Sequence, residues 1–321
     1  MRPINLMFDD VNVAYTHMQR MKDSCSVWED TRNGRAQVIQ EPVIVTHAAP
    51  YRRVLFDAKR DANPFFHYME AIWMLAGSEN VNFPAHFAAN IRQYSDDGVT
   101  LHGAYGYRWR YAFEIDQIDA IIYMLKKDPT TRRAVISMWD PHLDLERDGK
   151  DLPCNTQLYF RIVSGSLNMT VLNRSNDMVW GMLGANIVHM SALHEYVARA
   201  VEARVGSLYQ FTNNLHVYEG WGGEDKYQEA PDNWYQLNPS YRRHPFSPNN
   251  LYWEEALDFV EDMDPDGNWQ CRILRDNAVP MLAAWDAYKE GDLPLASHWA
   301  HNIHDDDWAT ACLRWLERRV K

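Results

Sequence analysis

Apolar residues recur at helical spacing in several parts of the chain. Residues 64–77 form an almost continuous apolar stretch with proline near its start and glycine at its end, which predicts a buried helix. One charge, Glu70, interrupts this stretch. Residues 115–127 are amphipathic at helical spacing and are followed by Asp128-Pro129, which predicts a helix that stops there.

The strand signals lie in the middle of the chain. Segments rich in β-branched and aromatic residues predict strands at 133–139, 156–163, 166–172 and 207–211. Ser164-Gly165 separates the second and third of these segments, which predicts a β-hairpin. Between the third and fourth strands, residues 186–203 carry a long helical pattern.

The character of the sequence changes beyond residue 222. Asp, Asn, Pro and Trp are frequent in residues 223–250, which predicts an irregular connection. Helical patterns follow at 252–263, 278–290 and 305–320. We therefore predict an α+β fold with a mixed-sheet core from about 30 to 220. The catalytic domain would span 1–222, and 223–321 would be a linker and a helical extension packed on that domain.

The composition narrows the possible partners and compartments. A formal net charge of −12 argues against broad binding to nucleic acid or anionic membranes, so any bound anion needs a local cationic pocket. We find no secretory signal and no stretch near the roughly 20 apolar residues that a membrane span needs. The four cysteines have no paired spacing, which indicates neither disulfides nor a zinc site. A reducing, cytoplasmic setting is expected.

The most informative chemistry lies in residues 151–177. A Pro-Cys pair ending at Cys154 is followed at about two-strand spacing by Asn173-Arg174-Ser175-Asn176-Asp177. This spacing suggests a thiolate nucleophile beside a phosphate anchor, in which Arg174 and Ser175 donate hydrogen bonds to a phosphate monoester. A lone cysteine is more often a small buried hydrophobe, so the interpretation depends on further motifs.

Eight short segments, in chain order, supply those motifs. They are Arg32-Asn33-Gly34, the helix around Glu70, His102 to Arg110, Asp128 to Arg133, Cys154, Asn173 to Asp177, Asn186, and His216-Val217-Tyr218. Together they resemble the thymidylate synthase family, which includes the phage-type deoxypyrimidine monophosphate hydroxymethylases. The resemblance runs from about residue 30 to about residue 220, more than half of the chain.

The resemblance implies roles for twelve residues. The catalytic residues would be Cys154, Glu70, Tyr105 and Asp177. The phosphate would be bound by Arg32, Arg132, Arg133, Arg174 and Ser175. Asn186 would read the base, and His216 and Tyr218 would hold the sugar. Because Arg132 and Arg133 reach the partner's phosphate in this family, the resemblance implies a homodimer with shared active sites. It also implies 5,10-methylenetetrahydrofolate as co-substrate, and no metal.

The same resemblance implies a sequence of chemical steps. Addition of the Cys154 thiolate to carbon 6 turns the pyrimidine into an enolate, which attacks the one-carbon unit through carbon 5. Cationic neighbours such as Arg174 are expected to lower the pKa of this thiol. Glu70 would manage protons through ordered water, and Tyr105 would help remove the proton from carbon 5.

Two departures from the synthases point to the product. The chain ends in a basic helical segment, 312–321, where synthases have a tail that closes over the folate, and Asn90 to Ser95 replaces a tryptophan-rich stretch. A less complete lid would admit water, which converts the exocyclic methylene to hydroxymethyl. Asn176 in the phosphate-anchor motif, where synthases usually have cysteine, also resembles the hydroxymethylases.

Several alternatives stay open at this point. Asn186 favours dUMP, since the deoxycytidylate hydroxymethylases carry aspartate there, but a flipped amide also pairs with cytosine. The function expected first is 5-hydroxymethylation of dUMP, with thymidylate synthase and dCMP hydroxymethylase as alternatives. An inactive nucleotide- or RNA-binding homologue is the non-enzyme alternative. Neither nucleic acid as a substrate nor a membrane is expected, and a phage-encoded chain would act in the host cytoplasm.

Overall fold

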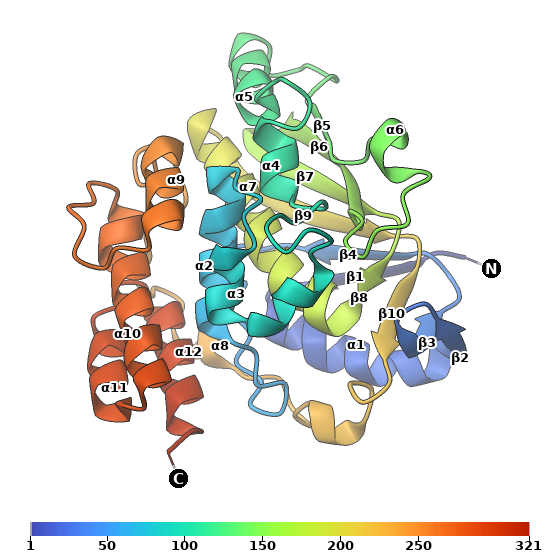
Figure 1. The fold of residues 1–321 in the computed structure, drawn as a ribbon. Coiled ribbons are helices and arrows are strands. Elements are labelled where there is room, and N and C mark those ends of the chain that lie inside the picture. Colours follow the sequence, from blue (N-terminus) through green and yellow to red (C-terminus); the bar gives the residue numbers. More distant parts are fainter. Residues whose placement is uncertain (1, 321) are drawn as a thin grey trace.

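Two mixed β-sheets form the centre of the computed structural model, which describes residues 2–320 (Figure 1). In spatial order, the six-stranded sheet contains β1 (Ile4–Phe8), β4 (Val43–His47), β9 (Arg204–Thr212), β7 (Ser166–Asn173), β6 (Asn155–Val163) and β5 (Val135–Ser137). The β1–β4 and β7–β9 pairs are parallel, and the remaining pairs are antiparallel. The smaller sheet contains β2 (Ser26–Thr31), β3 (Gly34–Ile39), β10 (Leu215–Tyr218) and β8 (Asn176–Asp177). The predicted α+β class is confirmed.

The predicted hairpin joins β6 and β7. Its turn residues Ser164 and Gly165 have φ values of 50° and 74°, the left-handed conformations that a tight two-residue connection requires. Along β7, Leu167, Met169 and Val171 are buried and alternate with half-exposed residues. One face of the six-stranded sheet therefore faces the core.

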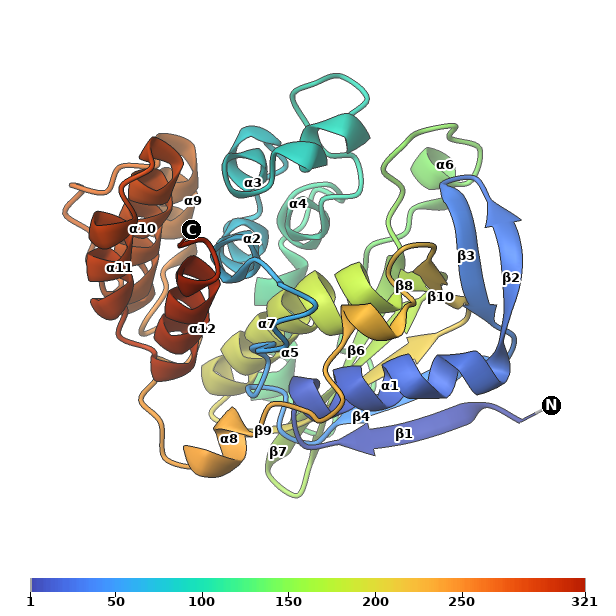
Figure 2. The same cartoon turned by 90° about the horizontal axis from the view of Figure 1, so that it is seen from below.

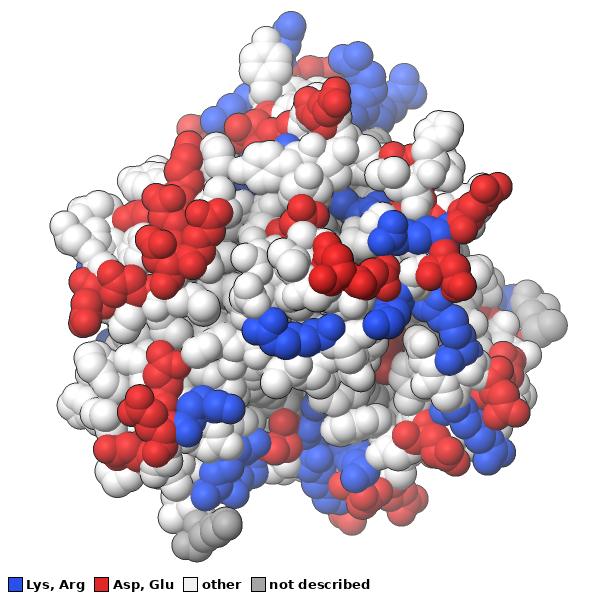
Figure 3. Space-filling view, viewed as in Figure 1, with Lys and Arg blue, Asp and Glu red and all other residues white. Residues whose placement is uncertain are grey.

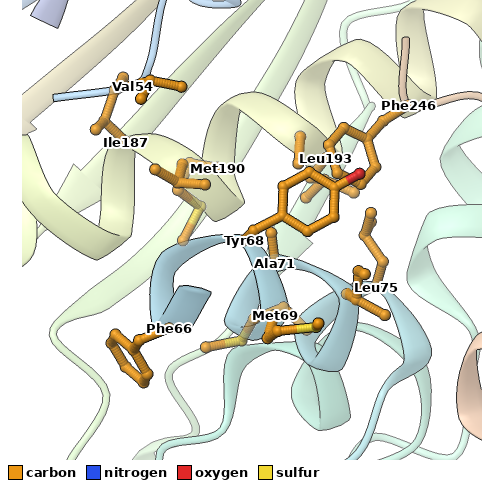
Figure 4. Close-up of a cluster of buried hydrophobic side chains, with 14 of the residues drawn as sticks. Val54, Phe66, Tyr68, Met69, Ala71, Leu75, Ile187, Met190, Leu193 and Phe246 are labelled. Atoms are coloured by element: carbon orange, nitrogen blue, oxygen red, sulfur yellow. The ribbon is translucent and has the colours of Figure 1, made fainter. Parts of the chain in front are cut away.

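Helices cover that face in two layers. α1 (Val11–Cys25) and α7 (Asn186–Ala200) lie directly against the sheet, and α2 (Pro64–Ala76) packs on the outer side of α7 (Figure 2). Tyr68, Ala71 and Leu75 of α2 point toward Met190 and Leu193 of α7 (Figure 4). This burial explains why the α2 segment is apolar almost all round.

The ends of α2 are also specified by its sequence. The Asn63 side chain accepts a hydrogen bond from the Phe66 amide at 3.2 Å, and Pro64 occupies the first helical turn. Gly77 ends the helix with φ of 78°, the left-handed conformation for which glycine is favoured. Gly106 of α4 (Tyr105–Arg110) approaches this helix so closely that a Cβ atom would lie 2.0 Å from the Met74 carbonyl oxygen.

The C-terminal helices stack on the far side of α2. They are α9 (Trp253–Asp262), α10 (Val279–Glu290), α11 (Leu293–His301) and α12 (Asp306–Glu317) (Figure 1). Phe65 of α2 contacts Trp315 with ring centroids 5.6 Å apart, and Tyr68 contacts Trp308 at 5.1 Å. One continuous hydrophobic cluster therefore includes both the sheets and these helices.

The remaining helices are short apart from one. They are α3 (Asn82–Phe87), α5 (Gln117–Lys127), α6 (Pro141–Asp144) and α8 (Trp234–Leu237). α5 stops at Lys127, directly before Asp128-Pro129, as predicted. Residues before 30, which we did not include in the predicted core, supply a sheet strand and a packed helix in β1 and α1. The core thus starts near residue 4, which corrects the predicted boundary.

The surface carries charge of both signs. Acidic side chains gather over α9 on the left of Figure 3, from Glu254, Glu255, Asp258, Glu261 and Asp262. Basic side chains stand among acidic ones on the right of the same face (Figure 3). Within residues 2–320, no helix combines the length and the apolar character that crossing a membrane requires.

Candidate active site

Nine of the twelve predicted site residues line one cavity of about 700 Å³. They are Arg32, Tyr105, Cys154, Arg174, Ser175, Asp177, Asn186, His216 and Tyr218. The cavity lies where the first strand residues of β6 and the ends of β7, β8 and β10 come together with the β2–β3 turn. Residues far apart in the sequence thus converge because the two sheets meet here.

Cys154 and Arg174 lie side by side because β6 and β7 pair as a hairpin. The Arg174 amide donates to the Cys154 carbonyl at 3.0 Å, and the Arg174 Nε donates to the Pro153 carbonyl at 3.0 Å. The same guanidinium places Nη2 3.8 Å from the Cys154 sulfur. It also lies over the Trp139 ring, with Cζ 5.6 Å from the centroid. Hydrogen bonds to the backbone therefore hold the expected nucleophile and the expected phosphate ligand side by side.

The electrostatics of Cys154 differ from the expectation. Burial raises the pKa of the thiol, and the positive charges of Arg174 and Arg32 oppose this rise without reversing it. Asp151 and Asp177 add to the rise by repelling a thiolate. The thiol form therefore predominates at neutral pH, and formation of a thiolate at Cys154 requires a proton acceptor.

Tyr105 supports the nucleophile from the first residue of α4. Its hydroxyl oxygen accepts the Cys154 amide at 3.3 Å and the Asn155 amide at 3.4 Å. Burial and the neighbouring Cys154 raise the pKa of this phenol well above its usual value. Tyr105 is thus neutral, and any proton that it receives must go to a lone pair of its oxygen.

Asp177 and His216 are neighbours through the parallel β8–β10 pair, in which they are register partners. The Asp177 carboxylate accepts the amides of Val179 at 2.7 Å and Trp180 at 2.9 Å. Burial raises the pKa of Asp177, and burial lowers the pKa of His216. The His216 ring packs edge-on against Tyr218, with centroids 4.9 Å apart. Asp177, His216 and Tyr218 therefore form one wall of the larger cavity, and their contacts with neighbouring residues fix the positions of their polar groups.

Asn186 begins α7 directly after a widened, irregular turn at Met178–Ala185. Gly184 in this turn has φ of −109° and ψ of −108°, outside the helical range. Widened turns of this kind are frequent at functional sites. The Asn186 Nδ2 donates to Asn176 Oδ1 at 3.1 Å, while the buried Asn176 Nδ2 has no partner among the described residues. Asn176 was not predicted as a site residue, although it lies within the phosphate-anchor motif.

Glu70 lines a second, smaller cavity of about 170 Å³. This cavity adjoins the first, because Tyr94, Tyr105, Asp151 and Asn186 line both. The Glu70 side chain is 12% exposed and its Oε2 lies 3.3 Å from His189 Nδ1. Glu70 is thus not a helix-surface charge. The sequence motifs do not single out His189, because its partner Glu70 is 119 residues away in the sequence.

Arg132 and Arg133 lie apart from both cavities. They are exposed and belong to the turn between α5 and β5. They line neither cavity within the single chain. Among residues 2–320, no group of three His, Cys, Asp or Glu side chains could hold a metal ion.

Comparisons with known proteins agree with this geometry. The family model described as thymidylate synthase matches residues 60–258. The deoxyuridylate hydroxymethyltransferase of Pseudomonas phage M6 is 43% identical over 317 residues, covering 91% of this chain and 88% of that protein. The enzyme of the same name from Bacillus phage SP01 is 39% identical, over 55% of this chain and 49% of that protein. A third, from Delftia phage PhiW-14, is 30% identical over 69% of this chain and 64% of that protein.

The mixed sheets, the cavity that gathers the predicted site residues and these matches define a transferase. The chain belongs to the thymidylate synthase family.

Proposed function

We propose that the protein transfers a one-carbon unit from 5,10-methylenetetrahydrofolate to carbon 5 of dUMP and forms 5-hydroxymethyl-dUMP. The observation that carries this proposal is the meeting of Cys154, Arg174 and Asn186 in one cavity, in a chain 43% identical to a phage deoxyuridylate hydroxymethyltransferase. Reductive methylation to dTMP and hydroxymethylation of dCMP are the competing reactions.

The cavity offers a partner for each part of the nucleotide. Arg174, Ser175 and Arg32 supply donors for the phosphate, and Arg174 is already fixed by backbone carbonyls. His216 and Tyr218 stand on β10 as sugar ligands. Asn186 donates one hydrogen to Asn176, which leaves its other hydrogen and its oxygen for O4 and N3–H of uracil.

Different residues supply the nucleophile and the proton transfers. The Cys154 thiolate adds to carbon 6 of the base, so that carbon 5 becomes nucleophilic. Glu70, paired with His189, exchanges protons with the base through water in the smaller cavity. The neutral Tyr105 hydroxyl holds the Cys154 backbone and lies at the border of the two cavities.

We assign the smaller cavity to the ring of a reduced folate. Trp73, Met74, Ile91 and Leu101 supply apolar surface, and Glu70 and His189 supply polar groups. When bound there, the folate would deliver the one-carbon unit at the border with the larger cavity. Among residues 2–320, none after Tyr218 lines either cavity, which favours access of water to the reaction.

We further propose a homodimer. The outer face of the six-stranded sheet carries Tyr159, Thr170 and Tyr209 in one register row, and all three are at least partly exposed. An uncovered sheet face with aromatic residues suits a two-fold interface. Arg132 and Arg133 are exposed and free to reach a neighbouring cavity. Because the relatives are phage proteins, the proposal places the reaction in the host cytoplasm.

A competition experiment tests the choice of base. The protein is incubated with 5,10-methylenetetrahydrofolate and an equimolar mixture of dUMP and dCMP, and the nucleotides are analysed by mass spectrometry. We expect dUMP alone to gain a hydroxymethyl group. Modification of dCMP in preference to dUMP would contradict the proposed role of Asn186.

A substitution at the nucleophile tests whether the protein is an enzyme. Cys154→Ser should abolish product formation and leave dUMP binding within a few-fold of wild type, because Arg174 and Asn186 are unchanged. A wild-type protein that binds dUMP but forms no product would instead support the nucleotide- or RNA-binding alternative. Isothermal titration calorimetry provides the binding measurement.

A further inference from the structure

Asp151 is a carboxylate of the active site to which the sequence motifs assign no role. It lies three residues before the nucleophile and lines both the larger and the smaller cavity. Its Oδ2 accepts the Gly103 amide at 2.8 Å. A Cβ atom on Gly103 would lie 2.9 Å from Asp151 Oδ1, so the glycine lets the carboxylate pack against this backbone. The segment around Gly103, which is distant in the sequence, therefore fixes the position of the Asp151 carboxylate.

The contacts of Asp151 leave one oxygen available. Within residues 2–320, no group donates a hydrogen bond to Oδ1, and this oxygen remains accessible to solvent. Each of the other two acids of the site lines one cavity only, Glu70 the smaller and Asp177 the larger. Glu70 is paired with His189, and one oxygen of Asp177 accepts two backbone amides. Asp151 is thus the site carboxylate best placed to accept a proton at the border of the cavities.

The surroundings favour a basic carboxylate. Burial raises the pKa of Asp151, and the hydrogen bond from the Gly103 amide and the nearby His102 and Arg108 reduce this rise without reversing it. A carboxylate with a raised pKa accepts a proton more readily than one in water. Tyr105, which also lines both cavities and contacts the Cys154 amide, is a neutral phenol and a poor proton acceptor.

We propose that Asp151 is the general base that activates the water that becomes the hydroxymethyl oxygen. The inference rests on the proposed hydroxymethylation of dUMP and names the residue that directs its last step to water. The substrate of this step is the pyrimidine bound through carbon 6 to Cys154 and carrying an exocyclic methylene at carbon 5.

The step balances as follows. The water oxygen forms a bond to the methylene carbon, and its proton passes to the Asp151 carboxylate. The electron pair of the exocyclic double bond moves to the ring and forms the enolate at carbon 4. This enolate collapses, the carbon 5–carbon 6 double bond re-forms, and the bond from carbon 6 to the Cys154 sulfur breaks. The thiolate leaves, and no oxidant or reductant is required.

Asp151→Asn tests the inference, because it keeps an oxygen for the Gly103 amide and removes the base. We expect formation of 5-hydroxymethyl-dUMP to fall by about 100-fold or more. In a single turnover with enzyme in excess, release of tritium from [5-³H]dUMP should stay within a few-fold of the wild-type rate, since that release precedes attack by water. Equal losses of both rates would overturn the inference, as they would show a structural role or an earlier one.

An added thiol distinguishes loss of the general base from a defect elsewhere in the active site. A thiolate needs no general base, so 2-mercaptoethanol should capture the methylene in Asp151→Asn and give a 5-thioether of dUMP, detected by mass spectrometry. Absence of that thioether would contradict the inference. Asp148→Asn, an exposed carboxylate on the same loop, is the matched control and should form 5-hydroxymethyl-dUMP at the wild-type rate.

Failure of the inference and failure of the proposed function give different results. If wild-type protein forms dTMP, the proposed function is wrong and the water step does not exist. If wild-type and Asp151→Asn proteins form 5-hydroxymethyl-dUMP at similar rates, the function stands and Asp151 is not the base.

Discussion

Some residues of the site can be predicted from the sequence, whereas others can be identified only in the folded structure. Cys154 and Arg174 could be predicted because a motif of known spacing joins them. Asp151 could not, since its contact Gly103 is 48 residues away in the sequence. His189 could not either, because it meets Glu70 across 119 residues. Asn176 gave a partial signal inside the phosphate-anchor motif, but its bond to Asn186 depends on the widened turn between them.

At this scale, Asn186→Asp should change the choice of base. An aspartic acid side chain accepts from the amino group of cytosine and, when protonated, donates to N3, whereas it loses the donor for O4 of uracil when ionised. We expect kcat/KM for dUMP to fall by about 100-fold and that for dCMP to rise, given about 1–3 kcal/mol for a hydrogen bond in a buried site. Steady-state kinetics with both nucleotides provide the measurement. An unchanged ratio of the two values would show that Asn186 does not read the base.

Secondary-structure elements were largely predictable where the hydrophobic period was strong. α2, α5 and the β6–β7 hairpin lie within two residues of the predicted segments. The four N-terminal strands and α1 were missed. The strands join their sheets only because β4 pairs with the distant β9 and β3 with the distant β10, while β1 pairs with β4 and β2 with β3. α11 was also missed, although Pro294 after the capping Asp292 was a usable signal.

The burial of a carboxyl group at the start of α12, where Tyr235 of α8 donates a hydrogen bond to Asp307, predicts a pH effect on stability. Asp307, at the start of α12, is buried, and burial raises its pKa to about 7 from a usual value of 3.8. The folded state therefore binds this proton more tightly than the unfolded state, so the contribution of Asp307 to stability falls as pH rises from about 4 to about 7. Above that window the ionised carboxylate destabilises the fold.

Asp307→Asn should remove this penalty. We expect the free energy of unfolding to rise at pH 8 by on the order of 1–3 kcal/mol and to change little at pH 4. Urea unfolding at the two pH values measures the difference. Asp306→Asn is a less buried control, because Asp306 pairs with Arg242 at the surface. Equal changes at both pH values would contradict the assignment.

On the scale of the whole molecule, two features had no explanation within one chain. Arg132 and Arg133 lie outside the cavity, and one face of the six-stranded sheet is uncovered. The proposed homodimer would account for both. The division into a catalytic domain, 1–222, and a helical extension, 223–321, is proposed from a change in the sequence pattern. In the structure, residues of both segments belong to one hydrophobic core. The aromatic contacts of α12 with α2 could not be predicted from patterns that are local in the sequence.

Mixing two inactive variants tests the shared site. In a mixed dimer of Cys154→Ala and Arg132→Ala chains, one site combines an intact nucleophile with an intact partner arginine. Random exchange of subunits should restore roughly a quarter of wild-type activity. Native mass spectrometry would verify that mixed dimers form. An inactive mixed dimer would show that Arg132 does not serve the neighbouring site.

The oxidation state of the folate product tests the central claim most directly. Capture of the methylene by water leaves the folate as tetrahydrofolate, whereas reductive methylation oxidises it to dihydrofolate. After reaction with dUMP, we predict tetrahydrofolate in amounts equal to 5-hydroxymethyl-dUMP, measured by chromatography with mass detection. Dihydrofolate in amounts equal to dTMP would contradict the account and identify the protein as a thymidylate synthase.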